Sequence, residues 1–259
     1  MLLAVDIGNT NITIGMFDGE IPGRSLRFAV NPAGMADEYG IALLDSFRRM
    51  GVEAADIHAI VIGSVVPDLT PLFAEACLNY LGCQPFIADG RMKTGLRTKY
   101  DSPRQLGVDR IAASAAAYKL YGGPVCVIDF GTATTFDAVS ADGRHLGGAI
   151  APGIGIASEA LLLGAAKLPG MDITLHYERP ASVIGRNMRQ SLQSGLLYGY
   201  TGLVEGLIAR FRAELGADMK VVATGGFAEI IAEETTSIEI SAPWLMLDGL
   251  RILYHMNRH

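Results

Sequence analysis

The chain carries the same strand–turn–strand pattern twice, once in each half of its length. Near the N-terminus, the apolar residues 2–5 lead into DIGNTN and then into an alternating run that ends at Asp18-Gly19. The second copy, VCVIDFGTATTFDAVSADG, begins at Val125, and its Asp129 lies 123 residues after Asp6. An apolar run followed by an alternating one predicts two strands joined by a tight turn. A pattern repeated at about half the length of a 259-residue chain indicates a duplicated domain.

Each copy places an aspartate, a glycine and small polar residues at the turn. Gly8 and Gly131 let the backbone approach a ligand closely, and the N–H groups of tight turns bind anions. Asp6 and Asp129 favour a cation as well, because carboxylates lie beside phosphate oxygens when a cation lies between them. The pair predicts a nucleotide-phosphate and metal site in a cleft between two similar domains. The alternative is that these residues serve only the turns, where Asp, Asn and Gly are common.

The rest of the chain predicts an α/β fold. A strand is expected over residues 25–30, and helical patterns cover about residues 37–50, 69–81, 154–164 and 187–214. Strands followed by helix, strand and helix in each half give a mixed sheet flanked by helices. We expect one domain over residues 1–117 and a second over residues 118–259.

Composition narrows the classes of function. A formal net charge of −6 speaks against nucleic-acid binding, which needs clustered Lys and Arg. The cysteines, Cys77, Cys83 and Cys126, lack the spacing of a metal site and are expected to be reduced in the cytoplasm. The apolar stretch 147–166 is interrupted by Pro152 and Glu159, so we expect no membrane span.

Taken in order along the chain, nine stretches resemble the type III pantothenate kinase family. They are DIGNTN (6–11), GSVVPDL (63–69), KTGL (93–96), KYDSPRQLGVDRI (99–111), IDFGTATTFD (128–137), LGGAIAPG (146–153), AAKLP (165–169), QSGLLYGYTGLVEG (193–206) and ATGG (223–226). A single short motif would be weak, but an ordered set across the whole chain is specific.

The resemblance implies a fold, a reaction and partners. The family belongs to the sugar kinase/actin/Hsp70 superfamily, so the expected fold is two duplicated ribonuclease-H-like (actin-like) domains with an interdomain nucleotide cleft. The reaction is phosphorylation of pantothenate by ATP to give 4′-phosphopantothenate, the first step of coenzyme A biosynthesis. Members are homodimers that use Mg²⁺ with ATP and a monovalent cation, K⁺ or NH₄⁺.

The resemblance also implies roles for individual residues. Asp109 would accept the proton of the pantothenate hydroxyl, Asp129 would bind the monovalent cation, and Asp6 would lie near magnesium. The residues expected to bind ATP are Asp6, Ile7, Gly8, Asn9, Thr10, Asn11, Ile12, Thr13 and Thr132. Those expected to bind pantothenate are Tyr100, Gly107, Val108, Asp109 and Arg110.

Two of these residues have alternatives. Asp109 precedes an alanine-rich helical pattern, where an aspartate also caps the helix and complements its dipole. The guanidinium of Arg110 suits either the carboxylate of pantothenate or a transferring phosphoryl group.

The sequence departs from the family pattern at one residue. Where the family usually has a threonine that contacts the substrate, this chain has Met188, in GRNM. A thioether supplies no hydroxyl, so the contact is missing or is made by Ser191, one helical turn away. This departure keeps open a related kinase with another small hydroxylated substrate. The other alternative is a non-catalytic nucleotide-binding regulatory protein. The joint presence of four residues argues against it: Asp6, Asp109, Arg110 and Asp129.

Overall fold

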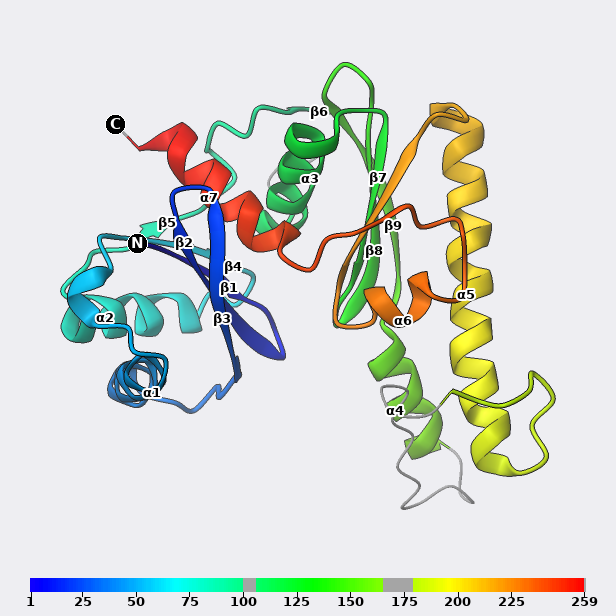
Figure 1. Cartoon of the computed structure of the whole chain (residues 1–259), viewed down its shortest axis with the longest axis horizontal. Coiled ribbons are helices and arrows are strands. Elements are labelled where there is room, and N and C mark those ends of the chain that lie inside the picture. Colours follow the sequence, from blue (N-terminus) through cyan, green and yellow to red (C-terminus); the bar gives the residue numbers. More distant parts are fainter. Residues whose placement is uncertain (100–105, 165–178, 259) are drawn as a thin grey trace. The chain divides into compact units, whose positions relative to one another are not determined.

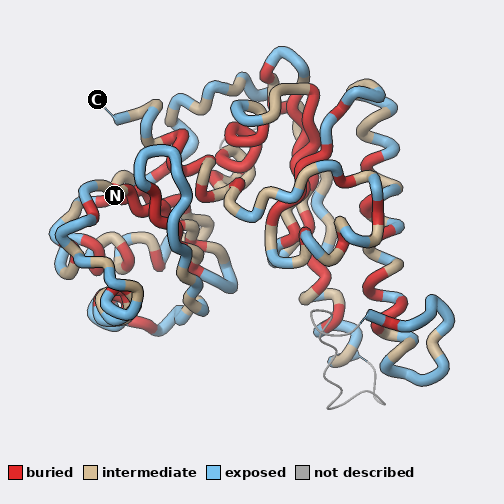
Figure 2. The backbone as a smooth tube through the Cα atoms, viewed as in Figure 1, coloured by how far each residue is buried: buried red, intermediate tan, exposed pale blue. Residues whose placement is uncertain are grey.

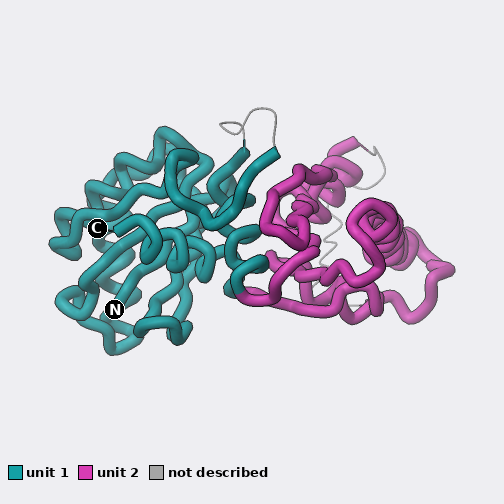
Figure 3. The backbone as a smooth tube through the Cα atoms, turned by 90° about the horizontal axis from the view of Figure 1, so that it is seen from above, with its two compact units in different colours: residues 1–119, 244–259 teal, residues 120–243 magenta. Residues whose placement is uncertain are grey.

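The computed structural model describes residues 1–99, 106–164 and 179–258, and the chain divides into two compact units (Figure 3). Unit 1 comprises Met1–Lys119 and Trp244–His259, and unit 2 comprises Leu120–Pro243. The units divide after Lys119, whereas the sequence analysis placed the boundary after residue 117. The sequence analysis assigned the C-terminal stretch to the second domain, but in the structure it belongs to unit 1. Among the described residues, no helix has the length and apolar character needed to cross a membrane.

Unit 1 is a mixed sheet with helices. Its elements are β1 (Leu2–Ile7), β2 (Asn11–Asp18), β3 (Ile21–Ala29), α1 (Ala36–Arg49), the 3-10 helix η1 (Ala54–Asp56), β4 (Ala59–Ser64), α2 (Leu69–Leu81), β5 (Phe86–Ile87), β6 (Arg97–Thr98), α3 (Val108–Tyr121), which ends just inside unit 2, and α7 (Leu245–Asn257). Five strands follow the order β3-β2-β1-β4-β5 (Figure 1). The pairs β1–β2 and β2–β3 are antiparallel, and the pairs β1–β4 and β4–β5 are parallel.

Unit 2 repeats this arrangement. Its elements are β7 (Val125–Phe130), β8 (Ala133–Val139), β9 (Arg144–Pro152), α4 (Ile154–Gly164), α5 (Met188–Leu215), β10 (Lys220–Gly225), α6 (Ala228–Ala232) and β11 (Ile240–Ser241). The strands of this unit follow the order β9-β8-β7-β10-β11, with β7–β8 and β8–β9 antiparallel and β7–β10 and β10–β11 parallel. Strands β7 to β11 therefore correspond one by one to β1 to β5, which confirms the predicted duplicated α/β fold.

Both faces of the unit 1 sheet are covered, and the covering helices explain the place of α7. Along β1, alternate side chains point to opposite faces. Leu3, Val5 and Ile7 pack in a buried core with α1 and α2. Leu2 and Ala4 pack in a second core with residues of α3 and α7 (buried segments, Figure 2). The C-terminal helix thus belongs to unit 1 because its leucines complete this second core.

In unit 2 the same alternation separates an apolar face from the face that carries Asp129. Cys126, Ile128 and Phe130 of β7 pack with α5 and α6 in one core. Val127 and Asp129 point to the other face. The aspartate at the end of β7 therefore has the same place in unit 2 as Asp6 has in unit 1.

Candidate functional site

The loop between β1 and β2 is exposed at its tip and held at its base. Gly8 donates its N–H to the carbonyl oxygen of Asn11 (3.0 Å), which closes the turn. Val30, directly after β3, donates its N–H to the carbonyl oxygen of Thr10 (2.9 Å). Asn9, Thr10 and Asn11 are exposed. The loop therefore presents polar side chains and backbone groups from a fixed frame, which suits the binding of an anion.

Asp6 lies in the central strand that leads into this loop. It pairs with Thr13 of β2 on one side and with Gly63 of β4 on the other. By the alternation along β1, its half-buried side chain shares the face of Leu2 and Ala4, which is covered by α3 and α7.

The first turn of α3 lies at the same end of the unit 1 strands as this loop. Val65, directly after β4, donates its N–H to the carbonyl oxygen of Ile7 (3.0 Å) at the end of β1. A Cβ placed on Gly107 would lie 3.7 Å from Cγ1 of Val65, so Gly107 packs against this strand end. Asp6 and Asp109 are thus brought to one end and one face of the same sheet. The carboxyl ends of parallel strands are the usual ligand site of open α/β sheets.

Asp109 is part of the first turn of α3, and Gly107 leaves room for its carboxylate. Its Oδ1 accepts the backbone N–H of Arg110 (2.8 Å). A Cβ on Gly107 would overlap this same oxygen. The capping alternative expected Asp109 to precede the helix, but Asp109 is the second residue of α3, and its oxygen satisfies one of the N–H groups of the first turn. This hydrogen bond does not exclude the role of a base, because a carboxylate has two oxygens that accept hydrogen bonds.

The loop between β7 and β8 is the counterpart in unit 2. Asp129 pairs with Thr135 of β8, as Asp6 pairs with Thr13 of β2. Gly131 donates its N–H to the carbonyl oxygen of Ala133 (3.1 Å), and Thr132 is exposed. The strand pairing thus gives Asp6 and Asp129 equivalent places, although the hairpin of unit 2 is one residue shorter.

The end of β10 lies directly against the carboxylate of Asp129, and the sequence did not predict this contact. Gly225 has φ +92°, and a Cβ placed on it would lie 2.5 Å from Oδ1 of Asp129. Gly226 donates its N–H to the carbonyl oxygen of Phe130 (3.0 Å). Nothing in the ATGG motif (223–226) indicated that Gly225 lies against the carboxylate of Asp129.

Some predicted site residues can act only through their backbone. The side chains of Ile7 and Ile12 are fully buried in the core with α1 and α2, and Val108 is buried in the core with α7. Any contact of these residues with ATP or pantothenate therefore involves their N–H or carbonyl groups.

The remaining predicted residues fall into three groups. Tyr100 lies outside the described residues. Arg110 is half-buried in the first turn of α3. Binding of its guanidinium to the carboxylate of pantothenate or to the phosphoryl group stays a prediction. Met188 and Ser191 are exposed in the first turns of α5, where Ser191 Oγ donates a long hydrogen bond to the carbonyl oxygen of Gly185 (3.5 Å).

The donors at the two loops suit metal ions that also bind phosphate. Asp6 and Asp129 supply oxygen atoms, which Mg²⁺ and K⁺ prefer over nitrogen or sulfur. Within the described residues, no group of three or more His, Cys, Asp or Glu side chains forms a metal cage. Magnesium in kinases is bound by one or two carboxylates together with the substrate phosphates, so this sparse set of donors fits it.

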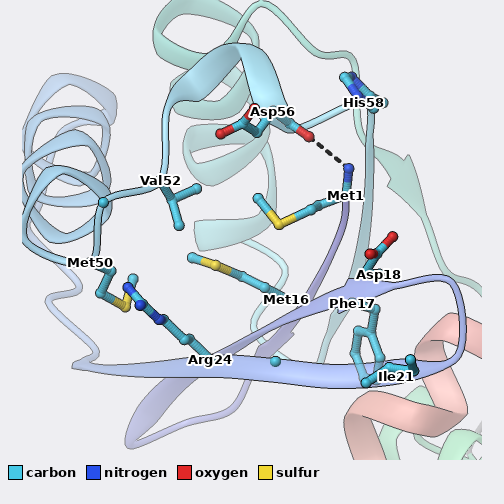
Figure 4. Close-up of a pocket in the computed structure, with 12 residues that line it drawn as sticks. Met1, Met16, Phe17, Asp18, Ile21, Arg24, Met50, Val52, Asp56 and His58 are labelled. Atoms are coloured by element: carbon cyan, nitrogen blue, oxygen red, sulfur yellow. Dashed lines mark hydrogen bonds between the residues drawn. The ribbon is translucent and has the colours of Figure 1, made fainter.

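A cavity of about 570 Å³ in unit 1 lies away from these residues (Figure 4). Met1 and Asp18 line it, so it lies at the opposite end of the β1–β2 hairpin from Gly8, about 20 Å away at the usual rise of a strand. Its wall is largely apolar. The N-terminal ammonium group of Met1 donates a hydrogen bond to the carbonyl oxygen of Asp56 (2.6 Å). None of the predicted site residues lines this cavity.

Comparison with known proteins identifies the family. The profile of the family described as type III pantothenate kinase matches residues 2–210. A type III pantothenate kinase from Roseiflexus sp. (strain RS-1) is 49% identical over 258 residues, covering 100% of both chains.

Two solved structures share the fold at low identity. A protein from Campylobacter jejuni described as a Baf family transcriptional activator superposes with a TM-score of 0.58, 21% identity and 98% of each chain covered. An inorganic polyphosphate/ATP-glucomannokinase from Arthrobacter sp. strain KM gives a TM-score of 0.52 at 17% identity, with 99% of each chain covered. These two likenesses concern the fold alone. The family profile and the full-length identity go further: the chain belongs to the type III pantothenate kinase family and phosphorylates pantothenate in coenzyme A biosynthesis.

Proposed function

We propose that Asp109 is the base of this reaction and accepts the proton of the pantothenate hydroxyl as the phosphoryl group is transferred. The β1–β2 loop and Thr132 bind the phosphates of ATP, and residues 107–110, with Tyr100, bind pantothenate. The observation that carries this proposal is the placement of Asp6 and Asp109 at one end and one face of the unit 1 sheet.

The chemistry suits these residues. Phosphoryl transfer passes through a loose transition state, so catalysis depends mostly on positioning and on stabilising charge. Loop N–H groups and Thr132 orient the phosphates. The hydrogen bond from the N–H of Arg110 fixes the carboxylate of Asp109, which accepts the proton of the pantothenate hydroxyl. For the proton acceptor of such a reaction, the orientation of the carboxylate therefore matters more than its basicity.

The direct test is an assay of ADP release by the purified protein, with and without pantothenate. We expect ADP release only when pantothenate, ATP and a divalent metal are all present, with 4′-phosphopantothenate formed in equal amount. ATP bound without any pantothenate-dependent turnover would favour the regulatory alternative instead.

The family is ATP-dependent, so the protein uses a divalent metal ion with its nucleotide. We propose that this ion is Mg²⁺ near Asp6, where it would neutralise phosphate charge. A monovalent cation, K⁺ or NH₄⁺, is proposed to bind Asp129, whose carboxylate is held beside Gly225.

Activity is expected to depend on K⁺ or NH₄⁺, with Na⁺ a poor substitute, and Asp129→Ala should lose both most activity and this dependence. The reason is that alanine removes the carboxylate that attracts the cation. Initial rates of ADP release in K⁺, NH₄⁺ and Na⁺ salts of equal ionic strength measure the effect. Asp142→Ala is the matched control, because Asp142 is an exposed aspartate of unit 2 paired with Arg144 (2.7 Å). Equal wild-type rates in Na⁺ and K⁺ would remove the assignment.

Met188→Thr is expected to lower the KM for pantothenate about threefold to tenfold, with little change in kcat, because it restores a neutral hydrogen bond. Steady-state kinetics at saturating ATP measure it. If Ser191 already makes the contact, Met188→Thr has no effect and Ser191→Ala raises the KM instead. Should neither substitution change the KM, the start of α5 does not contact pantothenate.

We also propose that the protein is a homodimer in the cytoplasm. Large apolar side chains exposed on unit 2 support a subunit interface there, since such surfaces favour association. They come from α4, from the chain entering α5 and from the first residue of α5: Leu161, Leu163, Val183, Ile184 and Met188. The cysteines are free thiols, as expected in a reducing compartment.

A further inference from the structure

The hydroxyl of Tyr200 lies at the junction between β9 and α4. It donates to the carbonyl oxygens of Pro152 (3.1 Å) and Gly153 (3.3 Å), which share its single proton. Pro152 is the last residue of β9, and Gly153 directly precedes α4. Tyr200 belongs to α5, 47 residues beyond Gly153, so its side chain ties the long helix to this junction.

The junction in turn supports the β7–β8 loop. A Cβ placed on Gly153 would lie 2.6 Å from the carbonyl oxygen of Gly131 and would overlap that of Thr132. Pro152 also pairs with Ala133, the first residue of β8. The backbone of the loop therefore rests directly on Gly153, and a shift of Gly153 must shift the loop.

A side chain can form hydrogen bonds with these two carbonyl oxygens only as a donor. The carbonyl of Gly153 already accepts the first hydrogen bond of α4, from the N–H of Ala157 (2.9 Å), and carbonyls cannot donate. Burial raises the pKa of the Tyr200 phenol above its ordinary value, which keeps the proton in place.

We propose that Tyr200 is a positioning residue for ATP, which holds the Gly131-Thr132 turn in its phosphate-binding conformation by fixing Gly153. This rests on the function proposed above for Thr132. Tyr200 does not touch the nucleotide. Its hydroxyl fixes the carbonyl groups of Pro152 and Gly153, and Gly153 in turn supports the β7–β8 loop. The other explanation is that the hydroxyl only stabilises the packing of α5.

Tyr200→Phe separates these explanations, because it removes the hydroxyl and keeps the ring. We expect the affinity for a non-hydrolysable ATP analogue with Mg²⁺, measured by calorimetry, to fall about threefold to tenfold. The KM for ATP should rise by the same factor, while the KM for pantothenate stays unchanged. A role in packing alone would lower the melting temperature and leave the affinity for nucleotide as in the wild type.

Two further variants make the test specific. Tyr198→Phe is the matched control: Tyr198 is a half-buried tyrosine of the same helix whose hydroxyl makes no hydrogen bond within the described residues. Its affinity for the analogue should equal that of the wild type. In the double variant with Thr132→Ala, the loss caused by Tyr200→Phe should largely disappear, because both changes act on one contact.

The outcomes are distinguishable. Analogue bound equally well by wild type and Tyr200→Phe, or losses that add fully in the double variant, would overturn the role of Tyr200 and leave the proposed function intact. A wild-type protein that binds no ATP analogue would overturn the proposed function, and the role of Tyr200 with it.

Discussion

Asp109→Asn is expected to fold and to bind ATP, yet to lose about 10²-fold to 10⁴-fold in kcat, the usual contribution of a general base. Asparagine keeps the size of the side chain and an oxygen that can accept the N–H of Arg110, so the first turn of α3 stays intact. An amide oxygen does not take up the proton of the pantothenate hydroxyl at neutral pH. ADP release measures kcat, and thermal unfolding with calorimetric ATP binding establishes that the fold and the nucleotide site persist.

The matched control is Asp45→Asn, which changes an exposed aspartate of α1 that pairs with Arg48 (3.2 Å). It should leave kcat and the melting temperature close to those of the wild type. Near-wild-type turnover in Asp109→Asn would reduce Asp109 to a residue that stabilises the start of a helix.

Gly107→Ala is expected to lower kcat about 100-fold although it leaves Asp109, the proposed base, unsubstituted. The new Cβ would overlap Oδ1 of Asp109, and a side-chain oxygen yields more easily than backbone, so the carboxylate moves and the fold survives. A misplacement of about 1 Å costs on this order in rate, because the reacting groups lose alignment. The measurement is kcat for ADP release together with the melting temperature and the KM for ATP, both of which should change little.

Gly90→Ala is the control for this variant, since a Cβ placed on Gly90 has no neighbour within 4 Å. It measures the effect on kcat of a glycine-to-alanine change in unit 1 that creates no overlap with a neighbour. If Gly107→Ala turned over as fast as Gly90→Ala, the position of the Asp109 carboxylate would not limit the reaction.

Local patterns in the sequence predicted most elements. Helices expected over residues 154–164 and 187–214 are found at Ile154–Gly164 and Met188–Leu215, since a helix is specified by neighbours within a few residues. The strand expected over 25–30 begins earlier, at Ile21. It is an edge strand with exposed Pro22, Gly23 and Arg24, and these residues hide the alternation that marks a strand.

The sequence by itself determined the duplication, the family and the identity of the residues proposed for catalysis. Each of these follows from short motifs that occur in a fixed order along the chain. The match between Asp6 and Asp129 needed only the register of two hairpins, which the repeat already contained.

Only the tertiary structure decided how distant segments support these residues. It assigned α7 to unit 1, where its leucines complete a core with β1. It also revealed that Gly107, Gly153 and Gly225 each leave space for one group: the Asp109 carboxylate, the β7–β8 loop and the Asp129 carboxylate. The absence of a side chain carries no information about which neighbour fills its place. That neighbour is fixed by close packing between segments far apart in the chain, which no local pattern records.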